Sequence, residues 1–293
     1  MDESYPRKLH VWTGPAAAVH DLPLPPNGRG PVGASDFAQR LYAHEALGPA
    51  TPGARAEEAA EPYSLQWFLN IENQRHGRHG RWIPRLLEFA KHSGETLAGI
   101  GNGLGTDWLQ YARHGASVVV CSPSAEQLAL IRRNFELRGL PGRFLHVPPT
   151  ALPLESSSID VACVSSLLQE CPDPGALVNE VYRVLKPGGK VLAVTPARYD
   201  VDFWHRFWFP WWRWLRRAPC ASAVPTRFSA RGLRRLFGRF AEHRVYKRHL
   251  RRSEVPHVWR WLPQAVLERL MGRVLVLKAF KPLSAAMSAH LAA

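Results

Sequence analysis

Short apolar runs alternate with amphipathic segments between residues 95 and 195. The runs have the length of strands, and the segments between them repeat apolar residues at helical spacing. This alternation predicts an α/β fold with a doubly wound, mostly parallel sheet and helices on both faces. The expected strands are 95–100, 117–121, 143–147, 159–166, 190–195 and 273–280, and the expected helices are 105–115, 124–139, 173–186, 229–240 and 262–272. Glycines 188 and 189 are expected to form only a turn between a helix and a strand.

The flanking regions have a different composition. Residues 1–62 are rich in Pro, Gly and Ala, which predicts a flexible N-terminal extension with one short helix candidate at 35–47. Ordered structure is expected to begin near Tyr63, and the folded domain is expected to span 63–283, followed by a tail at 284–293.

The net charge indicates which partners are attracted, and the cysteine spacing indicates whether zinc sites or disulfides are present. A formal net charge of +14 predicts attraction to anionic surfaces such as nucleic acid or phospholipid headgroups. The four cysteines form no CxxC pair, so neither a zinc site nor a disulfide framework is indicated. The N-terminal residues lack the apolar stretch of a signal peptide, and no stretch has the length of a membrane span. We therefore expect a cytoplasmic protein, with contact to an anionic membrane from its surface left open.

The stretch "GIGNGLGTDW", residues 99–108, predicts a strand that runs through a glycine turn into a helix. Glycines at 101, 103 and 105 let the backbone turn sharply and approach a ligand, and the helix N-terminus offers free N–H groups. The dinucleotide fingerprint GxGxxG would need glycine at Thr106, which disfavours a nicotinamide or flavin site. The alternative is a tight turn that binds nothing.

Four blocks in the same order resemble the class I S-adenosylmethionine-dependent methyltransferases, in particular the small-molecule group called type 11. They are "GIGNGLGTDWLQYARHGA", "SPSAEQLALIRRNFELRGL", "RFLHVPPTALPLESSSIDVACVSSLLQECPDP" and "LVNEVYRVLKPGGKVLAV". The resemblance implies a seven-stranded Rossmann-like sheet, S-adenosylmethionine as the cofactor, a small-molecule acceptor and no metal.

The resemblance also assigns site residues. It implies a cofactor site of Gly99, Gly101, Asn102, Gly103, Gly105, Ser122, Pro123, Pro148, Thr150 and Ser165. Ser122 would contact the ribose, and the residues from Pro148 to Thr150 would flank the adenine. Glu170 is the candidate for a general base or a neighbour of the sulfonium, with a solvated helix-cap residue as its alternative.

Three positions depart from the family pattern. Its acidic residues are replaced by Gly99, Ser122 and Pro148. Because a hydrogen bond to a charged group contributes roughly 1.5–3 kcal/mol, losing two or three would weaken cofactor binding by about two to five powers of ten. Two functions follow: a methyltransferase with an altered pocket, or a catalytically degenerate domain that binds a membrane surface or a protein partner.

The segment 202–217 carries an aromatic face opposite a basic face, interrupted by Pro210. We expect a lid at about 200–220 over the carboxyl edge of the sheet, with Trp204, Trp208, Trp211 and Trp212 as a substrate wall that suits bulky or lipid-like acceptors. An interfacial helix on an anionic membrane is the alternative. Stacking on nucleic-acid bases is less favoured, because no RNA-binding motif accompanies the tryptophans.

Overall fold

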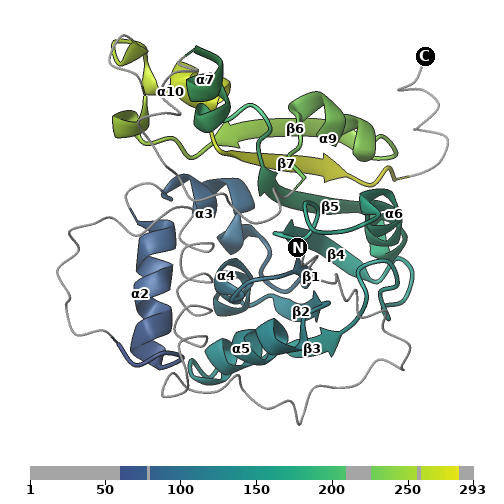
Figure 1. Ribbon diagram of the computed structural model, residues 1–293. Helices are drawn as coiled ribbons and strands as arrows, with labels where there is room; N and C mark the ends of the chain where they lie inside the picture. The colour runs from purple at the N-terminus through teal and green to yellow at the C-terminus, as the bar shows by residue number, and fades with distance from the viewer. Residues whose placement is uncertain (1–59, 78–79, 209–225, 256–258, 284–293) are drawn as a thin grey trace, which may run out of the picture.

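The computed structural model describes residues 60–77, 80–208, 226–255 and 259–283 (Figure 1). One seven-stranded sheet lies at its centre, in the order β3-β2-β1-β4-β5-β7-β6. The strands are β1 (Thr96–Gly101), β2 (Ser117–Ser122), β3 (Arg143–His146), β4 (Ile159–Ser165), β5 (Leu185–Pro196), β6 (Ala241–Arg248) and β7 (Val274–Phe280). The helices are α2 (Leu65–His76), α3 (Trp82–Leu87), η1 (Phe89–Lys91), α4 (Thr106–Arg113), α5 (Ala125–Glu136), α6 (Pro174–Val184), α7 (Val201–Trp208), α9 (Ala230–Leu236), η2 (Arg252–Glu254) and α10 (Gln264–Met271).

The pairing of the strands confirms the predicted topology. β1 pairs in parallel with β2 and β4, and β2–β3 and β4–β5 are parallel as well. β7 runs antiparallel to both β5 and β6. The carboxyl ends of β1 to β5 therefore share one edge of the sheet, and residues that follow them are brought together.

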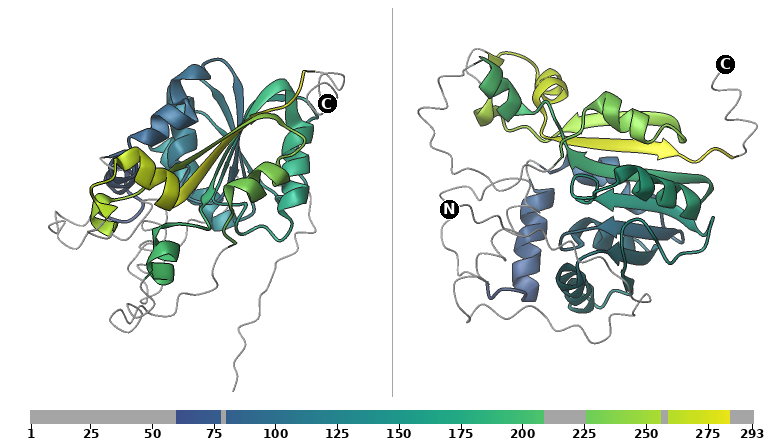
Figure 2. Two further views of the ribbon diagram at one scale, coloured as in Figure 1. Left: turned by 90° about the horizontal axis from the view of Figure 1, so that it is seen from above. Right: turned by 45° about the vertical axis from the view of Figure 1, so that its right-hand side comes forward.

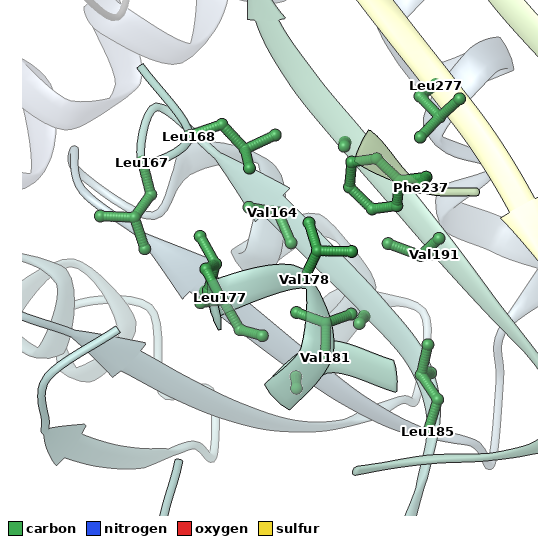
Figure 3. Packing of buried hydrophobic residues seen from close by; sticks show 14 of the residues in the cluster. Val164, Leu167, Leu168, Leu177, Val178, Val181, Leu185, Val191, Phe237 and Leu277 are labelled. Carbon is green, nitrogen blue, oxygen red and sulfur yellow. The ribbon is translucent and has the colours of Figure 1, made fainter. Parts of the chain in front are cut away.

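Helices cover both faces of the sheet, as Figure 2 shows from above. Alternate strand residues supply two separate hydrophobic clusters, because successive side chains in a strand point to opposite faces. On one face, Leu177, Val181 and Phe237 from α6 and the α9 region pack on Val164 and Val191 (Figure 3). The opposite cluster contains residues of α3, α4 and α5.

The connection from α6 into the sheet differs from the predicted turn. β5 already begins at Leu185, which pairs with Ile159, and the register with β4 then shifts before Val161 meets Lys190. Gly188 lies in this shift with φ +79°, a conformation that favours glycine. Glycines 188 and 189 therefore form an irregularity within a strand and not a turn between a helix and a strand.

Glu88 ties the end of α3 to the far half of the sheet. Its carboxylate receives Lys190 Nζ of β5 at 2.7 Å and Lys278 Nζ of β7 at 2.9 Å. Burial alone would raise its pKa, but the hydrogen bonds and charges of the two lysines lower the pKa of Glu88 to about 2. The carboxylate thus stabilises the fold in its ionised form.

The substitution Glu88→Gln is expected to lower the free energy of unfolding by about 3 kcal/mol at neutral pH. The folded pKa lies below the unfolded one, so this contribution is fully present above about pH 4.5 and is lost as the pH falls through about 2. Urea unfolding of both proteins between pH 7 and pH 3 measures it. A difference in stability that stays constant as the pH falls toward 3 would contradict the ionic origin.

Candidate functional site

The glycine loop between β1 and α4 has the backbone that the sequence predicts. Gly101, Gly103 and Gly105 have φ values of +147°, +124° and +68°. Gly101 pairs with Ser165 of β4, and a Cβ on Gly101 would lie 1.9 Å from the Ser165 carbonyl oxygen. Gly105 is the N-cap of α4 in the left-handed conformation. Glycine is therefore needed here for a close passage of the strands and for the entry into the helix.

Three of the predicted site residues form one hydrogen-bonded chain. Ser122 Oγ at the end of β2 donates to Asn102 Oδ1 at 3.2 Å, and Asn102 Nδ2 donates to Glu170 Oε2 at 2.7 Å. Ser122 is fully buried, whereas Glu170 is exposed. Asn102 thus connects the turn after β1 to the end of β2 and to Glu170, whose carboxylate is exposed in the segment after β4.

Gln127 is a site residue that the sequence argument missed. Its Oε1 accepts a hydrogen bond from Gly103 N at 2.5 Å. Gln127 lies three residues after Ser124, the N-cap of α5, which is the spacing of a capping box. This spacing is typical of a glutamine that caps its own helix. In the structure the Gln127 side chain contacts the glycine loop instead.

Gly99 faces the indole of Trp108. A Cβ on Gly99 would lie 2.7 Å from Trp108 Cγ and Cδ2, and Trp108 is 1% exposed. The indole therefore occupies the space that any side chain at position 99 would need. That an acidic residue is replaced at position 99 stays a prediction, and the packing of Trp108 against Gly99 was not predicted.

The other predicted cofactor residues lie along the same edge of the sheet. The Pro123 carbonyl faces His146 Nε2 at 3.1 Å, which fixes the turn after β2 beside the end of β3. Pro148 is half-buried, Thr150 is exposed and Ser165 is 8% exposed. Their contacts with an adenosine group stay a prediction.

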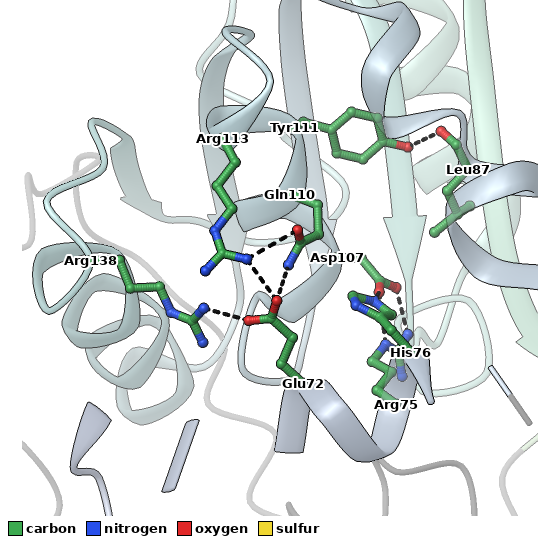
Figure 4. A network of polar contacts seen from close by, with 9 residues as sticks. All are labelled: Glu72, Arg75, His76, Leu87, Asp107, Gln110, Tyr111, Arg113 and Arg138. Carbon is green, nitrogen blue, oxygen red and sulfur yellow. Dashed lines mark hydrogen bonds and ion pairs between the residues drawn. The ribbon is translucent and has the colours of Figure 1, made fainter. Parts of the chain in front are cut away.

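A buried ion pair anchors α2 beside the glycine loop (Figure 4). Asp107, in the first turn of α4, receives Arg75 Nε at 2.8 Å and Nη2 at 2.5 Å, with His76 Nε2 at 3.1 Å. Asp107 and Arg75 are 4% and 6% exposed. Burial would raise the pKa of Asp107, but Arg75 and His76 hold it well below its usual range. The sequence predicted that ordered structure begins near Tyr63, but not this pairing.

A second carboxylate of α2 extends the network. Glu72 accepts from Gln110 Nε2 at 2.9 Å and from Arg113 Nη1 at 2.7 Å, both on α4. Arg138, just after α5, pairs with its other oxygen. Glu72 thus fixes α2 to α4 and to the segment just after α5.

Gln169, beside Glu170, has a buried side-chain oxygen without a donor. The residue is 7% exposed, and its Oε1 has no hydrogen-bond partner in the described part of the chain. Its backbone carbonyl accepts from Thr226 N at 3.2 Å. A buried acceptor left unpaired costs about 1–3 kcal/mol, so this oxygen is a candidate for contact with a bound group.

The described cysteines are buried thiols. Burial raises the pKa of Cys121 and of Cys163 to about 12, which keeps both protonated at neutral pH. Cys171 is also free, and Cys220 lies outside the described residues. Within the described ranges, no three His, Cys, Asp or Glu side chains gather as a metal site.

The aromatic segment is described only as far as α7. Trp204 Nε1 donates to the Leu270 carbonyl of α10 at 3.2 Å, so this tryptophan is packed against the neighbouring helix. His205 and Asp202, on the other face of α7, contact the Glu254 carbonyl and Arg273. The Trp208 side chain, Trp211 and Trp212 lie outside the described residues, so their role as a lid stays a prediction. No helix in the described ranges is long and apolar enough to cross a bilayer.

Comparison with known proteins agrees with this geometry. Residues 97–193 match the profile of a family described as a methyltransferase domain. This part of the chain is therefore similar to a methyltransferase domain. Demethylmenaquinone methyltransferases from Thermus thermophilus and Clavibacter sepedonicus are similar at 30% and 33% identity, covering 39% and 49% of this chain and 53% and 57% of the relatives. The chain thus spans about half the length of these curated relatives.

A solved structure shares the fold of this methyltransferase domain. An S-adenosylmethionine-dependent methyltransferase from Methanosarcina mazei superimposes with a TM-score of 0.51 at 21% identity, covering 69% of this chain and 98% of the other. The matched family is one of methyltransferase enzymes.

Proposed function

We propose that this chain is an S-adenosylmethionine-dependent methyltransferase that acts on a small molecule. The observation that carries the proposal is the chain Ser122–Asn102–Glu170, which assembles polar groups from three strand ends directly over the glycine loop. A loop that only turned the backbone would not need this arrangement.

The residue types at this edge of the sheet suit the binding of S-adenosylmethionine. The positive φ values of Gly101, Gly103 and Gly105 turn the backbone sharply between β1 and α4, and the methionine end of the cofactor would lie against this turn. Pro123 would lie toward the ribose and Pro148 to Thr150 toward the adenine. The Ser122 hydroxyl is buried in local hydrogen bonds, which favours Asn102 as the neutral polar contact in place of the usual acid.

When bound, S-adenosylmethionine supplies an electrophilic methyl group on a sulfonium. This chain has to hold the acceptor in line with that methyl group, which requires mainly orientation. Glu170 would place a negative charge near the sulfonium, or accept a proton from the acceptor. Gln169 Oε1 offers a hydrogen-bond acceptor beside it for an O–H or N–H group.

We infer a bulky or lipid-like acceptor. Two of the similar proteins are named for demethylmenaquinone, and the α7–α10 region after β5 is rich in apolar side chains. The degenerate binding module is the second candidate, favoured by the indole that fills the position of the first acid.

Calorimetric titration with S-adenosylmethionine and S-adenosylhomocysteine tests the two functions. We expect binding at micromolar concentration. The absence of both heat and a thermal shift at millimolar ligand would contradict the methyltransferase and support the binding module.

The variant Glu170→Gln is expected to weaken S-adenosylmethionine binding by about tenfold, because a charged contact contributes roughly 1.5–3 kcal/mol. Binding of S-adenosylhomocysteine, which lacks the positive sulfur, should change less. Glu155→Gln removes a charge from an exposed residue before β4 and serves as the matched control. Equal losses for both ligands in the Glu170 variant would show that its carboxylate does not act on the sulfonium.

A further inference from the structure

Exposed apolar side chains gather around α7 and α10. Seven large apolar residues are exposed in the described ranges, and only Leu65 and Leu283 lie elsewhere. The other five, named here the α7–α10 patch, are Tyr199, Phe207, Trp261, Val266 and Leu270, with exposed fractions of 43%, 65%, 78%, 42% and 42%. Scattered single residues of this kind are ordinary, but five on two adjoining helices and their approaches indicate an interaction surface.

Hydrogen bonds and ring contacts join the segments that carry the patch. Lys247 Nζ donates to the carbonyl oxygens of both Tyr199 and Leu270, so one ammonium joins the turn before α7 to the end of α10. The ring of Phe203 lies 5.0 Å from that of Tyr199 and 6.3 Å from that of Phe207. Figure 1 shows the two helices side by side beyond the end of β6.

The α7–α10 patch lies over buried apolar side chains. Val201, Leu250, Val255, Leu267 and Met271 form a separate hydrophobic cluster under α7 and α10. On α10, Leu267 and Met271 face this cluster while Val266 and Leu270 face outward. The helix is therefore apolar on more than the face that its own fold uses.

The charges around the patch are positive. The acids of this region are paired: Asp200 with Arg227, Asp202 and Glu254 with Arg273, and Glu268 with Arg248. Arg198, Arg252 and Arg269 are exposed, and none of them has an acidic partner within the described residues. An apolar surface bordered by unpaired arginines is complementary to an anionic bilayer, in which apolar side chains enter the headgroup region and arginines meet phosphates.

We propose that the α7–α10 patch docks this chain on an anionic lipid surface. Nucleic acid fits less well, because Val266 and Leu270 offer no ring on which a base can stack. The patch lies at the end of the sheet where β5 finishes and β7 begins, which is also the edge that holds the glycine loop. Docking would bring the cofactor edge near lipid. The inference does not depend on the proposed methyl transfer.

Co-sedimentation with vesicles tests the docking. Ligand-free protein is mixed with vesicles of phosphatidylcholine alone, or of phosphatidylcholine and phosphatidylglycerol in equal parts. We expect sedimentation with the anionic vesicles and little with the neutral ones. The variants Trp261→Ser/Leu270→Ser and Arg252→Ser/Arg269→Ser should each lower the partition by about tenfold.

A matched control separates the patch from general charge. Arg231→Ser/Arg234→Ser removes two exposed arginines from α9, which carries no exposed large apolar residue. This variant should bind anionic vesicles nearly as the parent does. Binding that falls equally in the control, or a parent protein that stays in the supernatant with both vesicles, would overturn the proposal. So would binding of single-stranded RNA that depends on Trp261 while vesicle binding does not.

Binding of S-adenosylhomocysteine by each variant provides a separate readout. Retained binding and an unchanged melting temperature show that the fold and the cofactor edge are intact. Loss of vesicle binding then reports on the patch alone, and a failure of cofactor binding in the parent leaves the vesicle result interpretable.

Discussion

Replacing Asp107 with asparagine is expected to lower the free energy of unfolding by about 3–5 kcal/mol, because it leaves the buried Arg75 charge without its partner. The two residues are 32 positions apart, so the pair fixes α2 against the start of α4 and not within one helix. The substitution should therefore loosen α2 and the glycine loop together. Urea unfolding measures the stability, and amide hydrogen exchange in α2 measures the local release.

Arg132→Ala is the matched control for this experiment. Arg132 pairs with Glu136 at 2.7 Å on the exposed face of α5, where one helical turn separates them. Such surface pairs contribute about 0.3–0.5 kcal/mol. The combined change Arg75→Met/Asp107→Leu should recover much of the loss, since apolar residues of similar size can replace a buried pair. A similar loss for Asp107→Asn and Arg132→Ala would contradict the buried origin of the effect.

The second large effect is expected at Gly99. Gly99→Asp introduces the acid that the resemblance led us to expect here, yet its Cβ would lie 2.7 Å from the Trp108 indole. Overpacking costs about 1–3 kcal/mol, and a buried unpaired carboxylate adds to it. We therefore expect a protein that unfolds more easily and binds S-adenosylmethionine no better than the parent.

A double-mutant cycle identifies the cause. Trp108→Ala alone should cost about 3–5 kcal/mol through the cavity that it leaves. With Trp108→Ala in place, Gly99→Asp should cost clearly less than in the parent, which gives a coupling of at least about 1 kcal/mol. Chemical denaturation of the four proteins measures this coupling. Additive losses would show that the indole does not exclude a side chain at position 99.

Periodicity and glycine spacing predicted the α/β sheet and the location of the loop, but only six of the seven strands. Alternating apolar runs predict strands wherever the sheet is buried on both faces, and the positive φ values at 101, 103 and 105 follow from glycine's freedom. The segment 242–250 gave no clear assignment, because β6 is an edge strand with half-buried and exposed positions.

The contacts within the site could not be predicted in the same way. Asn102 meets Ser122 and Glu170 across 20 and 68 positions, and such pairings depend on strand order, which no local pattern records. The spacing of Ser124 and Gln127 is that of a capping box, which predicts a contact of Gln127 with the backbone of its own helix and not with Gly103. Gly99 also had a signal in the sequence: a glycine inside a strand indicates close approach by another group. Comparison with the family pattern drew attention to the lost carboxylate instead.

The contact between Gly99 and Trp108 also restricts how this sequence can change over generations. A carboxylate introduced at position 99 by a single substitution meets the indole, and a smaller residue at 108 by itself leaves a cavity. Each of these single substitutions is therefore less stable than the present pair. A gain in cofactor affinity is therefore more accessible through Asn102 or Glu170 at the rim than through a side chain at position 99.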